Sequence, residues 1–168
     1  MDNRKLYTCC FTGHRPYKLP WGYNEHGIRF FIFKNKLQKI IKRIIKKGYI
    51  YFISGMALGA DIICAEIIVA LKKKHPNIQL ECAIPCLNQT CKWKSNNLKR
   101  YNYILSKADK LTYVSSTYYY NGCMQKRNLY MIDNSSLLVA IYNGKSGGTQ
   151  QTITLAKEKN LTIQILKP

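Results

Sequence analysis

The residues with the clearest capacity for chemistry lie in a glycine-rich turn at 142–149, with the sequence Tyr-Asn-Gly-Lys-Ser-Gly-Gly-Thr. An apolar run precedes this turn, and a run compatible with a helix follows it. Backbone N–H groups at such a turn, together with the positive end of the helix, form a site for an anion. A nucleotide phosphate is the usual ligand, so we expect a phosphate-binding cradle here. Its members are Gly144, Gly147, Gly148 and Thr149.

A second candidate segment is Gly13-His14-Arg15, which follows an apolar run at 6–11 that predicts a strand. Gly13 permits a close approach of the backbone to a ligand because it has no side chain. His14 and Arg15 either supply donors for a phosphate or a ribose, or they belong to a solvated loop. Open α/β sheets bind ligands at the carboxyl ends of their strands, and this favours the first interpretation.

A further glycine-bearing turn runs from Ser54 to Asp61, again after an apolar run. Gly55 and Gly59 keep a G-x3-G spacing, which allows close approach but is not a full dinucleotide fingerprint. Asp61 is expected in the first turn of a helix, where it either caps N–H groups or holds a ribose hydroxyl. We therefore count Ser54, Gly55, Gly59 and Asp61 as candidate ligand-binding residues.

Three side chains are candidates for catalysis. Asp61 and Glu66 form a pair of carboxylates about one turn apart on a predicted helix, and His14 is placed to assist them. Such a pair could do general acid/base work. A glutamate on a helix surface and an aspartate that caps a helix explain the same residues without catalysis.

The predicted helix at 123–133 contains Arg127 and Asn128, side by side. Arginine suits a bidentate contact with phosphate, so we expect Arg127 to neutralise a ligand, with Asn128 beside it in the site. Two tryptophans, Trp21 and Trp93, could each contact a ligand or simply pack against the protein. Trp21 caps a base or packs over the end of the sheet, and Trp93 stacks on a base or closes the edge of the core.

The elements that position these residues alternate along the chain. Apolar runs predict strands at 6–11, 49–53, 78–84, 110–114, 136–141 and 161–166. Between them, helices are predicted at 27–47, 62–74, 94–106, 123–133 and 150–159. Strict alternation predicts an α/β fold: a single Rossmann-like, doubly wound, mainly parallel sheet of about six strands with helices on both faces. All the candidate turns then lie at the carboxyl edge of this sheet.

The composition fits one domain over residues 1–168. An apolar fraction of 46% excludes a disordered chain. No apolar run approaches the roughly 20 residues of a membrane span, and the first residues contain no secretion signal. We therefore expect a cytoplasmic location and no membrane partner.

The net charge of +19 raises nucleic acid as a partner. The lysines are spread over several helix faces, however, where they keep helices soluble, so nucleic acid is not the favoured partner. Seven cysteines, an odd number, indicate reduced thiols. Because no C-x2-C pair occurs, no metal site is expected, and Cys64 and Cys82 are predicted in the core.

Five segments together resemble the DUF1273 (YpsA-like) family of the SLOG superfamily, which joins the Rossmann-like DprA/Smf proteins and the LOG proteins. These segments are Phe11 to Pro16 with Leu19 to Gly22, Ser54 to Asp61, Ala83 to Cys86, Arg127-Asn128 with Tyr130-Met131, and Gly147 to Thr149. They span nearly the whole chain in order. The resemblance implies a Rossmann-like fold with a pocket for a nucleotide or a nucleotide-derived ligand, and in the superfamily such pockets serve both enzymes and ligand sensors.

One departure from the superfamily bears on catalysis. LOG-type phosphoribohydrolases carry a P-G-G-x-G-T-x-x-E motif and an upstream arginine. Arg127 resembles that arginine, but Thr152 stands where the motif implies glutamate. The phosphate cradle is therefore retained, while the expected acid/base group is missing.

The expected function is binding of a nucleotide or ADP-ribose-like ligand, as a sensor or sequestering protein without catalysis and with no required cofactor. Two alternatives stay open. One is a nucleotide hydrolase of the LOG type in the same pocket. The other is a DprA-like binder of single-stranded DNA that uses surface lysines and stacks bases on Tyr118 to Tyr120. Self-association into a homo-oligomer is open as well.

Overall fold

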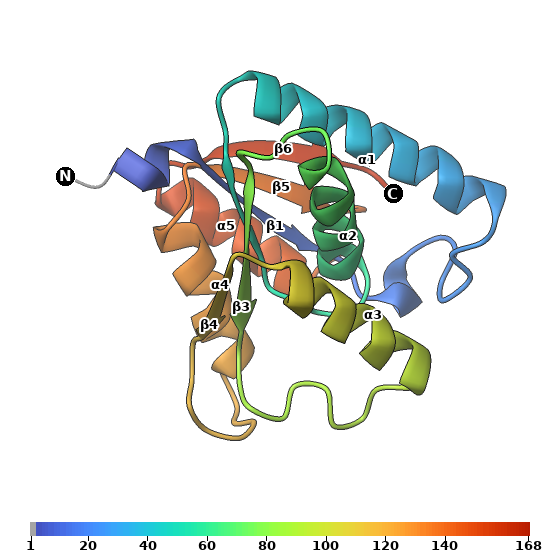
Figure 1. Cartoon of the computed structure of the whole chain (residues 1–168). Helices are drawn as coiled ribbons and strands as arrows, with labels where there is room; N and C mark the ends of the chain where they lie inside the picture. Colours follow the sequence, from blue (N-terminus) through green and yellow to red (C-terminus); the bar gives the residue numbers. More distant parts are fainter. Residues whose placement is uncertain (1–2) are drawn as a thin grey trace.

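The structure, a computed structural model, describes residues 3–168 and forms one parallel sheet between two layers of helices (Figure 1). The strands are β1 (Thr8–Gly13), β2 (Tyr51–Ser54), β3 (Gln79–Ile84), β4 (Lys110–Tyr113), β5 (Leu137–Ile141) and β6 (Thr162–Leu166). The helices are α1 (Ile28–Lys46), α2 (Ala60–Lys72), α3 (Ser95–Lys107), α4 (Cys123–Asp133) and α5 (Gly148–Glu158). Two short 3-10 helices, η1 (Asn3–Tyr7) and η2 (Pro16–Lys18), flank β1. The predicted α/β fold with a doubly wound parallel sheet is confirmed.

The strand order is β4-β3-β2-β1-β5-β6, and every neighbouring pair is parallel. From β1 the chain moves outward through β2, β3 and β4, and from β5 it moves the other way to β6. The order therefore reverses between β1 and β5, whose register ends with Gly13 opposite Ile141. Open α/β sheets bind ligands beside such a switch point, at the carboxyl ends of the strands.

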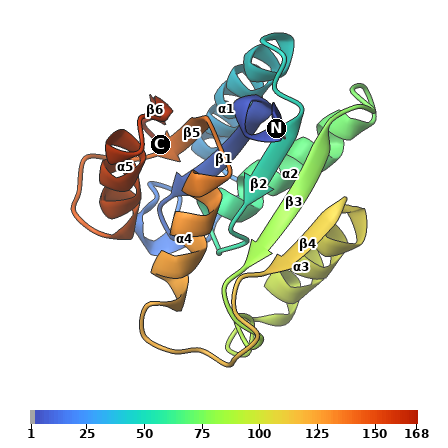
Figure 2. The same ribbon diagram turned by 90° about the vertical axis from the view of Figure 1, so that its left-hand side faces the viewer.

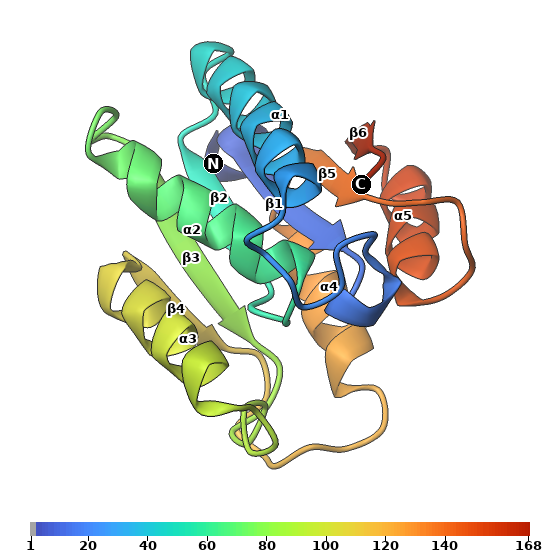
Figure 3. The ribbon, with the colours of Figure 1, turned by 90° about the vertical axis from the view of Figure 1, so that its right-hand side faces the viewer.

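The two faces of the sheet are covered by different helices. Figure 2 shows α4 and α5 in front of the sheet, and Figure 3 shows α1, α2 and α3 in front of the opposite face. Successive side chains of β1 alternate between the two cores: Cys9 and Phe11 pack under α1 to α3, and Cys10 packs under α4 and α5. Burial on both faces explains why the strands read as continuous apolar runs in the sequence.

Several element boundaries differ from prediction, among them both ends of β1 and the start of α5. Strand β1 begins at Thr8 rather than at 6, because Asn3–Tyr7 forms the 3-10 helix η1 with Leu6 and Tyr7 exposed. The strand then continues through Gly13, which was expected in the loop. Helix α5 begins at Gly148 rather than at 150, so the end of the glycine-rich turn is the first turn of the helix.

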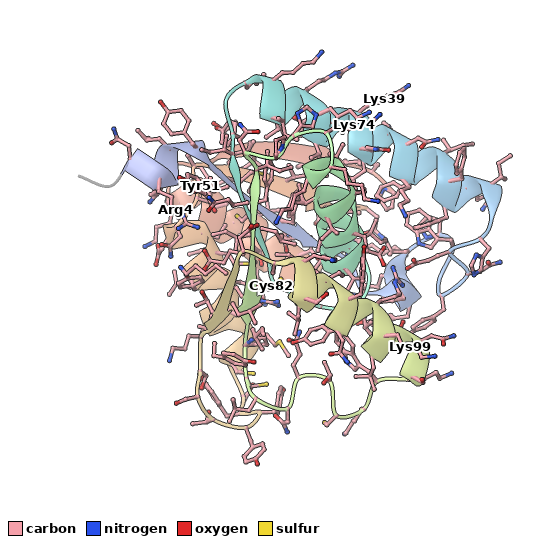
Figure 4. The ribbon with its side chains drawn as sticks, viewed as in Figure 1. Arg4, Lys39, Tyr51, Lys74, Cys82 and Lys99 are labelled. Carbon is pink, nitrogen blue, oxygen red and sulfur yellow. The ribbon has the colours of Figure 1, made fainter. Side chains whose placement is uncertain are left out.

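The positive charge is distributed over the surface. Helix α1 buries Phe33, Leu37 and Ile41 and exposes most of its lysines to solvent, as its pattern predicts. Exposed Lys39, Lys74 and Lys99 lie on α1, after α2 and on α3 (Figure 4). These exposed lysines therefore come from three separate segments of the chain.

The cysteines are unpaired, and Cys64 and Cys82 are fully buried in the core, as predicted. Burial raises the pKa of the Cys82 thiol to about 12. Within residues 3–168, no helix is both long enough and apolar enough to cross a membrane.

Candidate functional site

A cavity of about 220 Å³ opens at the carboxyl edge of the sheet, beside the switch point between β1 and β5. Four segments line it: the end of β1 with its loop, the start of α2, one side of α4, and the start of α5. In Figure 3 the blue loop after β1 lies at this edge, beside the first turn of α2. The predicted site residues in the cavity wall are Gly13, His14, Arg15, Asp61, Arg127, Asn128, Gly147, Gly148 and Thr149.

The glycine-rich turn contributes a helix start with free donors. Gly147, the residue before α5, has φ +140°, a backbone conformation that favours glycine. Within the described chain, no side chain caps α5 and no acidic residue lies in its first turn. The first N–H groups of a helix have no partner within the helix, so those of α5 are available to an anion in the cavity.

Two cations lie beside this helix start. Arg15 and Lys18 both line the cavity, and Lys18 Nζ donates a hydrogen bond of 3.3 Å to the carbonyl oxygen of Ser146. The lysine thereby joins η2 to the glycine-rich turn. A phosphate in the cavity would meet backbone donors on one side and these cationic side chains on the other.

His14 connects the loops that follow β1 and β5. Its Nε2 atom lies 2.7 Å from Oδ1 of Asn143 and 3.1 Å from the backbone nitrogen of the same residue. A protonated Nε2 donates to Oδ1, and an unprotonated Nε2 accepts the backbone N–H. On the other side of the ring, Nδ1 lies 3.5 Å from Thr149 Oγ1. Burial lowers the pKa of His14, which keeps the imidazole neutral at pH 7.

Asp61 and Arg127 form a buried pair at the back of the cavity. Arg127 Nη1 lies 3.5 Å from Asp61 Oδ2 and donates to the carbonyl oxygen of Gly55. The backbone N–H of Ala57 also donates to Asp61 Oδ2, at 3.3 Å. Because both charges lose solvation, burial raises the pKa of Asp61 and lowers the pKa of Arg127, while their mutual attraction opposes both shifts.

Three predicted residues shape the wall without lining it. Ser54 Oγ donates to the carbonyl oxygen of Asp61 and accepts the N–H of Met56. A side chain at Gly55 would collide with the Arg127 guanidinium. Gly59 has φ +96°, and a side chain there would collide with the carbonyl oxygen of His14. These positions are therefore required for the close packing of α2, β1 and α4 around the cavity.

Thr152, which occupies the position of the implied glutamate, has a defined structural role. Its hydroxyl donates 2.8 Å to the carbonyl oxygen of Gly148 and accepts 2.9 Å from Asn128 Nδ2. The side chain of Thr152 is buried, and it fixes Asn128 of α4 against the first turn of α5. This hydroxyl supports the cavity wall and does not replace a carboxylate.

Other predicted candidates lie elsewhere. Glu66 accepts two hydrogen bonds from Arg100, of 2.7 and 3.0 Å, and does not line the cavity with Asp61. Five residues of helix rotate a side chain by about 140°, so the two carboxylates leave α2 in different directions. Gly144 is exposed outside the cavity.

The two tryptophans pack against aromatic neighbours. Trp21 lies 4.6 Å from the ring of Phe33 and packs over the core below α1, which is the packing interpretation. Trp93 makes an edge contact of 5.3 Å with Tyr101 and also borders a second cavity.

Three residues at or beside the site, Tyr17, Lys18 and Asn143, were not predicted from the sequence. Tyr17 and Lys18 both lie in η2, the 3-10 helix that starts at Pro16, and a 3-10 helix brings residues three apart to the same side. Lys18 is three residues after Arg15, so a 3-10 turn after Pro16 would have placed Lys18 on the same side as the predicted site residue Arg15. Asn143 accepts the N–H of Lys145 at 3.0 Å, and this bond closes a turn that asparagine forms readily.

Among the described residues, no three His, Cys, Asp or Glu side chains gather to hold a metal.

Comparison with known proteins assigns the chain to a family. Residues 9–167 match the YpsA family, described as the YspA SLOG family. The uncharacterised SPbeta prophage-derived protein YoqJ of Bacillus subtilis is 35% identical over 144 residues, which cover 79% of this chain and 84% of that protein. A UPF0398 protein of Halalkalibacterium halodurans is 28% identical over 151 residues, covering 88% of this chain and 79% of the relative.

Two solved structures share the fold at low sequence identity. DNA processing protein A from Helicobacter pylori, described for its binding of single-stranded DNA, superposes with a TM-score of 0.65 and 20% identity. DprA from Streptococcus pneumoniae gives a TM-score of 0.67 and 15% identity. The matches cover 98% and 99% of this chain but only 66% and 52% of those two proteins. By its match over 159 of 168 positions (residues 9–167), the chain belongs to the YpsA family of SLOG proteins.

Proposed function

We propose that this protein binds a nucleotide or a nucleotide-derived ligand by its phosphate, as a sensor or sequestering protein that does not turn the ligand over. The phosphate would sit against the first turn of α5, between Arg15 and Lys18. The observation that carries the proposal is an uncapped helix start facing a cavity that also contains two cations. An anion is the kind of ligand that would accept hydrogen bonds from the helix start and pair with the two cationic side chains.

The wall residues support binding more than catalysis. Thr152 uses its hydroxyl within the protein, and no carboxylate replaces the implied glutamate at that position. Asp61 has one oxygen in contact with Ala57 and Arg127. A general base needs a free lone pair within hydrogen-bond reach of the proton that it removes, and of the two Asp61 oxygens Oδ1 is left for that role.

One observation favours a nucleotide hydrolase as the second candidate. Asp61 lines the cavity, and burial raises its pKa, which is common among catalytic carboxylates. In that case Asp61 would activate a water molecule for attack on an N-glycosidic or phosphate bond, with His14 beside it.

The two candidates are separated by incubating the protein with AMP, NAD and ADP-ribose while following melting temperature and product formation. Binding without turnover gives a rise in melting temperature with unchanged ligand on chromatography. A ligand at 100 times its dissociation constant stabilises the fold by about 2.7 kcal/mol.

Asp61→Asn is the decisive variant, because asparagine keeps the size of the side chain and an oxygen for the N–H of Ala57. Product that forms with the wild type and disappears with this variant would overturn the proposal in favour of the hydrolase. No ligand-dependent rise with any of the three compounds would refute nucleotide binding itself.

A further inference from the structure

A second and larger hollow lies along the same edge of the protein. It has a volume of about 600 Å³ and is lined by Tyr23, Leu58 and the segment from Lys92 to Asn97 at the start of α3. None of these residues belongs to the phosphate cavity. Of the segments that carry the family resemblance, Ser54 to Asp61 reaches this hollow through Leu58.

A third hollow, of about 250 Å³, lies between the two and shares walls with both. It shares Arg15 and Tyr17 with the phosphate cavity, and Tyr23 and Leu58 with the larger hollow. The three therefore follow one another around the loop after β1. We define this series as the extended groove.

The phosphate cavity alone is small for a whole nucleotide. Its volume of about 220 Å³ is below the range of about 300 to 1,000 Å³ that is usual for ligand pockets. Its wall is mainly polar, and Tyr17 is its one aromatic residue besides His14 among the described residues. It fits a phosphate and part of a sugar, so the first base must extend into the connecting hollow beside Tyr17.

The larger hollow has the chemistry of a base site. Tyr23 and Trp93 supply aromatic surfaces, and the side-chain amides of Asn96 and Asn97 supply donors and acceptors for a base edge. Tyr17 and Tyr23 are 69% and 70% exposed, so both rings are accessible to a ligand.

The electrostatics of the groove favour a ligand with more than one phosphate. Arg15, Lys92 and Lys94 line its connecting and larger hollows, and no acidic residue does so among residues 3–168. Glu25, close to Tyr23 in the chain, is paired with Arg100 at 2.8 Å.

From these observations we infer that the hollow between Tyr23 and Trp93 is a second subsite, which binds the aromatic base of a second nucleoside unit. The ligand is then of the dinucleotide class: two nucleoside units joined through phosphate, with one phosphate in the cavity at α5. This inference rests on the proposed phosphate site and specifies the ligand of that site.

The test compares the affinities of AMP and 5′-phosphorylated diadenylate by calorimetry, for the wild type and for Tyr23→Ala. Stacking of a base on an aromatic side chain changes affinity by roughly 5- to 150-fold. We expect diadenylate to bind the wild type at least about 10-fold more tightly than AMP. Tyr23→Ala should remove most of this gain and should weaken AMP by a smaller factor than it weakens diadenylate. Tyr103→Ala, an exposed tyrosine on α3 outside the groove, is the matched control.

A second variant, Lys92→Gln with Lys94→Gln, removes charge from two exposed side chains and leaves the packing of Trp93 intact. It should also weaken diadenylate more than AMP. NAD, assayed in parallel, tests whether a pyrophosphate linkage is accepted, and oligo-dA of two to ten nucleotides tests for a polynucleotide. An affinity that reaches its maximum at two units supports the inference.

Each contrary result has a distinct meaning. Equal affinities for AMP and diadenylate in the wild type would overturn the second subsite and leave the phosphate site standing. An affinity that keeps rising up to ten nucleotides would replace the dinucleotide class by single-stranded nucleic acid. Failure of both AMP and diadenylate to bind would overturn the proposed function together with this inference.

Discussion

Replacement of Gly148 by aspartate should separate folding from ligand binding. Gly148 is the first residue of α5 and lines the phosphate cavity. A Cβ atom built there meets nothing within 4 Å, and its φ lies outside the range that only glycine favours. A carboxylate at the start of a helix stabilises it by about 0.3 to 1 kcal/mol. We therefore expect the variant to melt at or above the temperature of the wild type.

The same carboxylate should exclude a phosphate. Two like unit charges 4 Å apart repel by about 1 kcal/mol in water and by about 4 kcal/mol near a protein surface. A phosphate dianion doubles this repulsion, and the carboxylate also competes for the N–H groups of the first turn. We expect the affinity for AMP to fall about 100-fold or more.

Calorimetric titration with AMP, together with a thermal melt of each protein, measures both effects. Gly148→Asn is the control, because it adds a side chain of nearly the same size without the charge, and we expect it to lose less than about 5-fold. Unchanged AMP affinity in Gly148→Asp would refute the placement of the phosphate at α5. Equal losses in both variants would show that the side chain acts by its size, and the electrostatic argument would be wrong.

Three further predictions concern the support of the cavity. Gly55→Ala should destabilise the protein by about 1 to 3 kcal/mol in urea unfolding, because the added methyl group displaces the guanidinium of Arg127. Thr152→Val should cost about 1 kcal/mol, because the amide of Asn128 loses its acceptor, and Thr152→Ser should restore it. Because burial holds the pKa of His14 below 6.5, the unfolded chain takes up a proton first as the pH falls. The contribution of this neutral histidine is therefore present above about pH 6.5 and lost below it, so the wild type should lose stability between pH 7 and 5 more steeply than His14→Gln.

Other results would contradict each of these predictions. A Gly55→Ala protein as stable as the wild type would mean that Arg127 has another position of equal energy. A Thr152→Val protein as stable as the wild type would mean that the hydrogen bond from Asn128 contributes nothing to the free energy of unfolding. Parallel pH profiles for the wild type and His14→Gln would show that His14 does not titrate differently in the folded and unfolded states.

The fold was predictable because apolar runs and amphipathic helices alternate without a break. Parallel strands buried on both faces leave a strong signal, and helix α1 shows its core face in every turn. The start of β1 was not predictable from this signal, since Leu6 and Tyr7 look like strand residues but belong to η1. A 3-10 helix at the chain start has no apolar periodicity to reveal it.

The position of the cavity could be predicted from the topology, because turns at the carboxyl ends of parallel strands converge at a switch point. Glu66 was harder to place, because only the direction of its side chain and the partner Arg100 on α3 separate it from Asp61. The roles of Ser54 and Gly55 in holding Arg127 and α2 also depend on contacts between elements far apart in the chain. A linear sequence does not contain those distances.

The most direct test of the phosphate site is an NMR titration of the ¹⁵N-labelled protein with AMP, followed through the backbone amides. We predict the largest shift changes at Gly147, Gly148 and Thr149, with smaller ones at Arg15 and Lys18, and no comparable change along α1. Changes that instead follow the lysines of α1, or no saturable change at any of the cavity residues, would contradict the account.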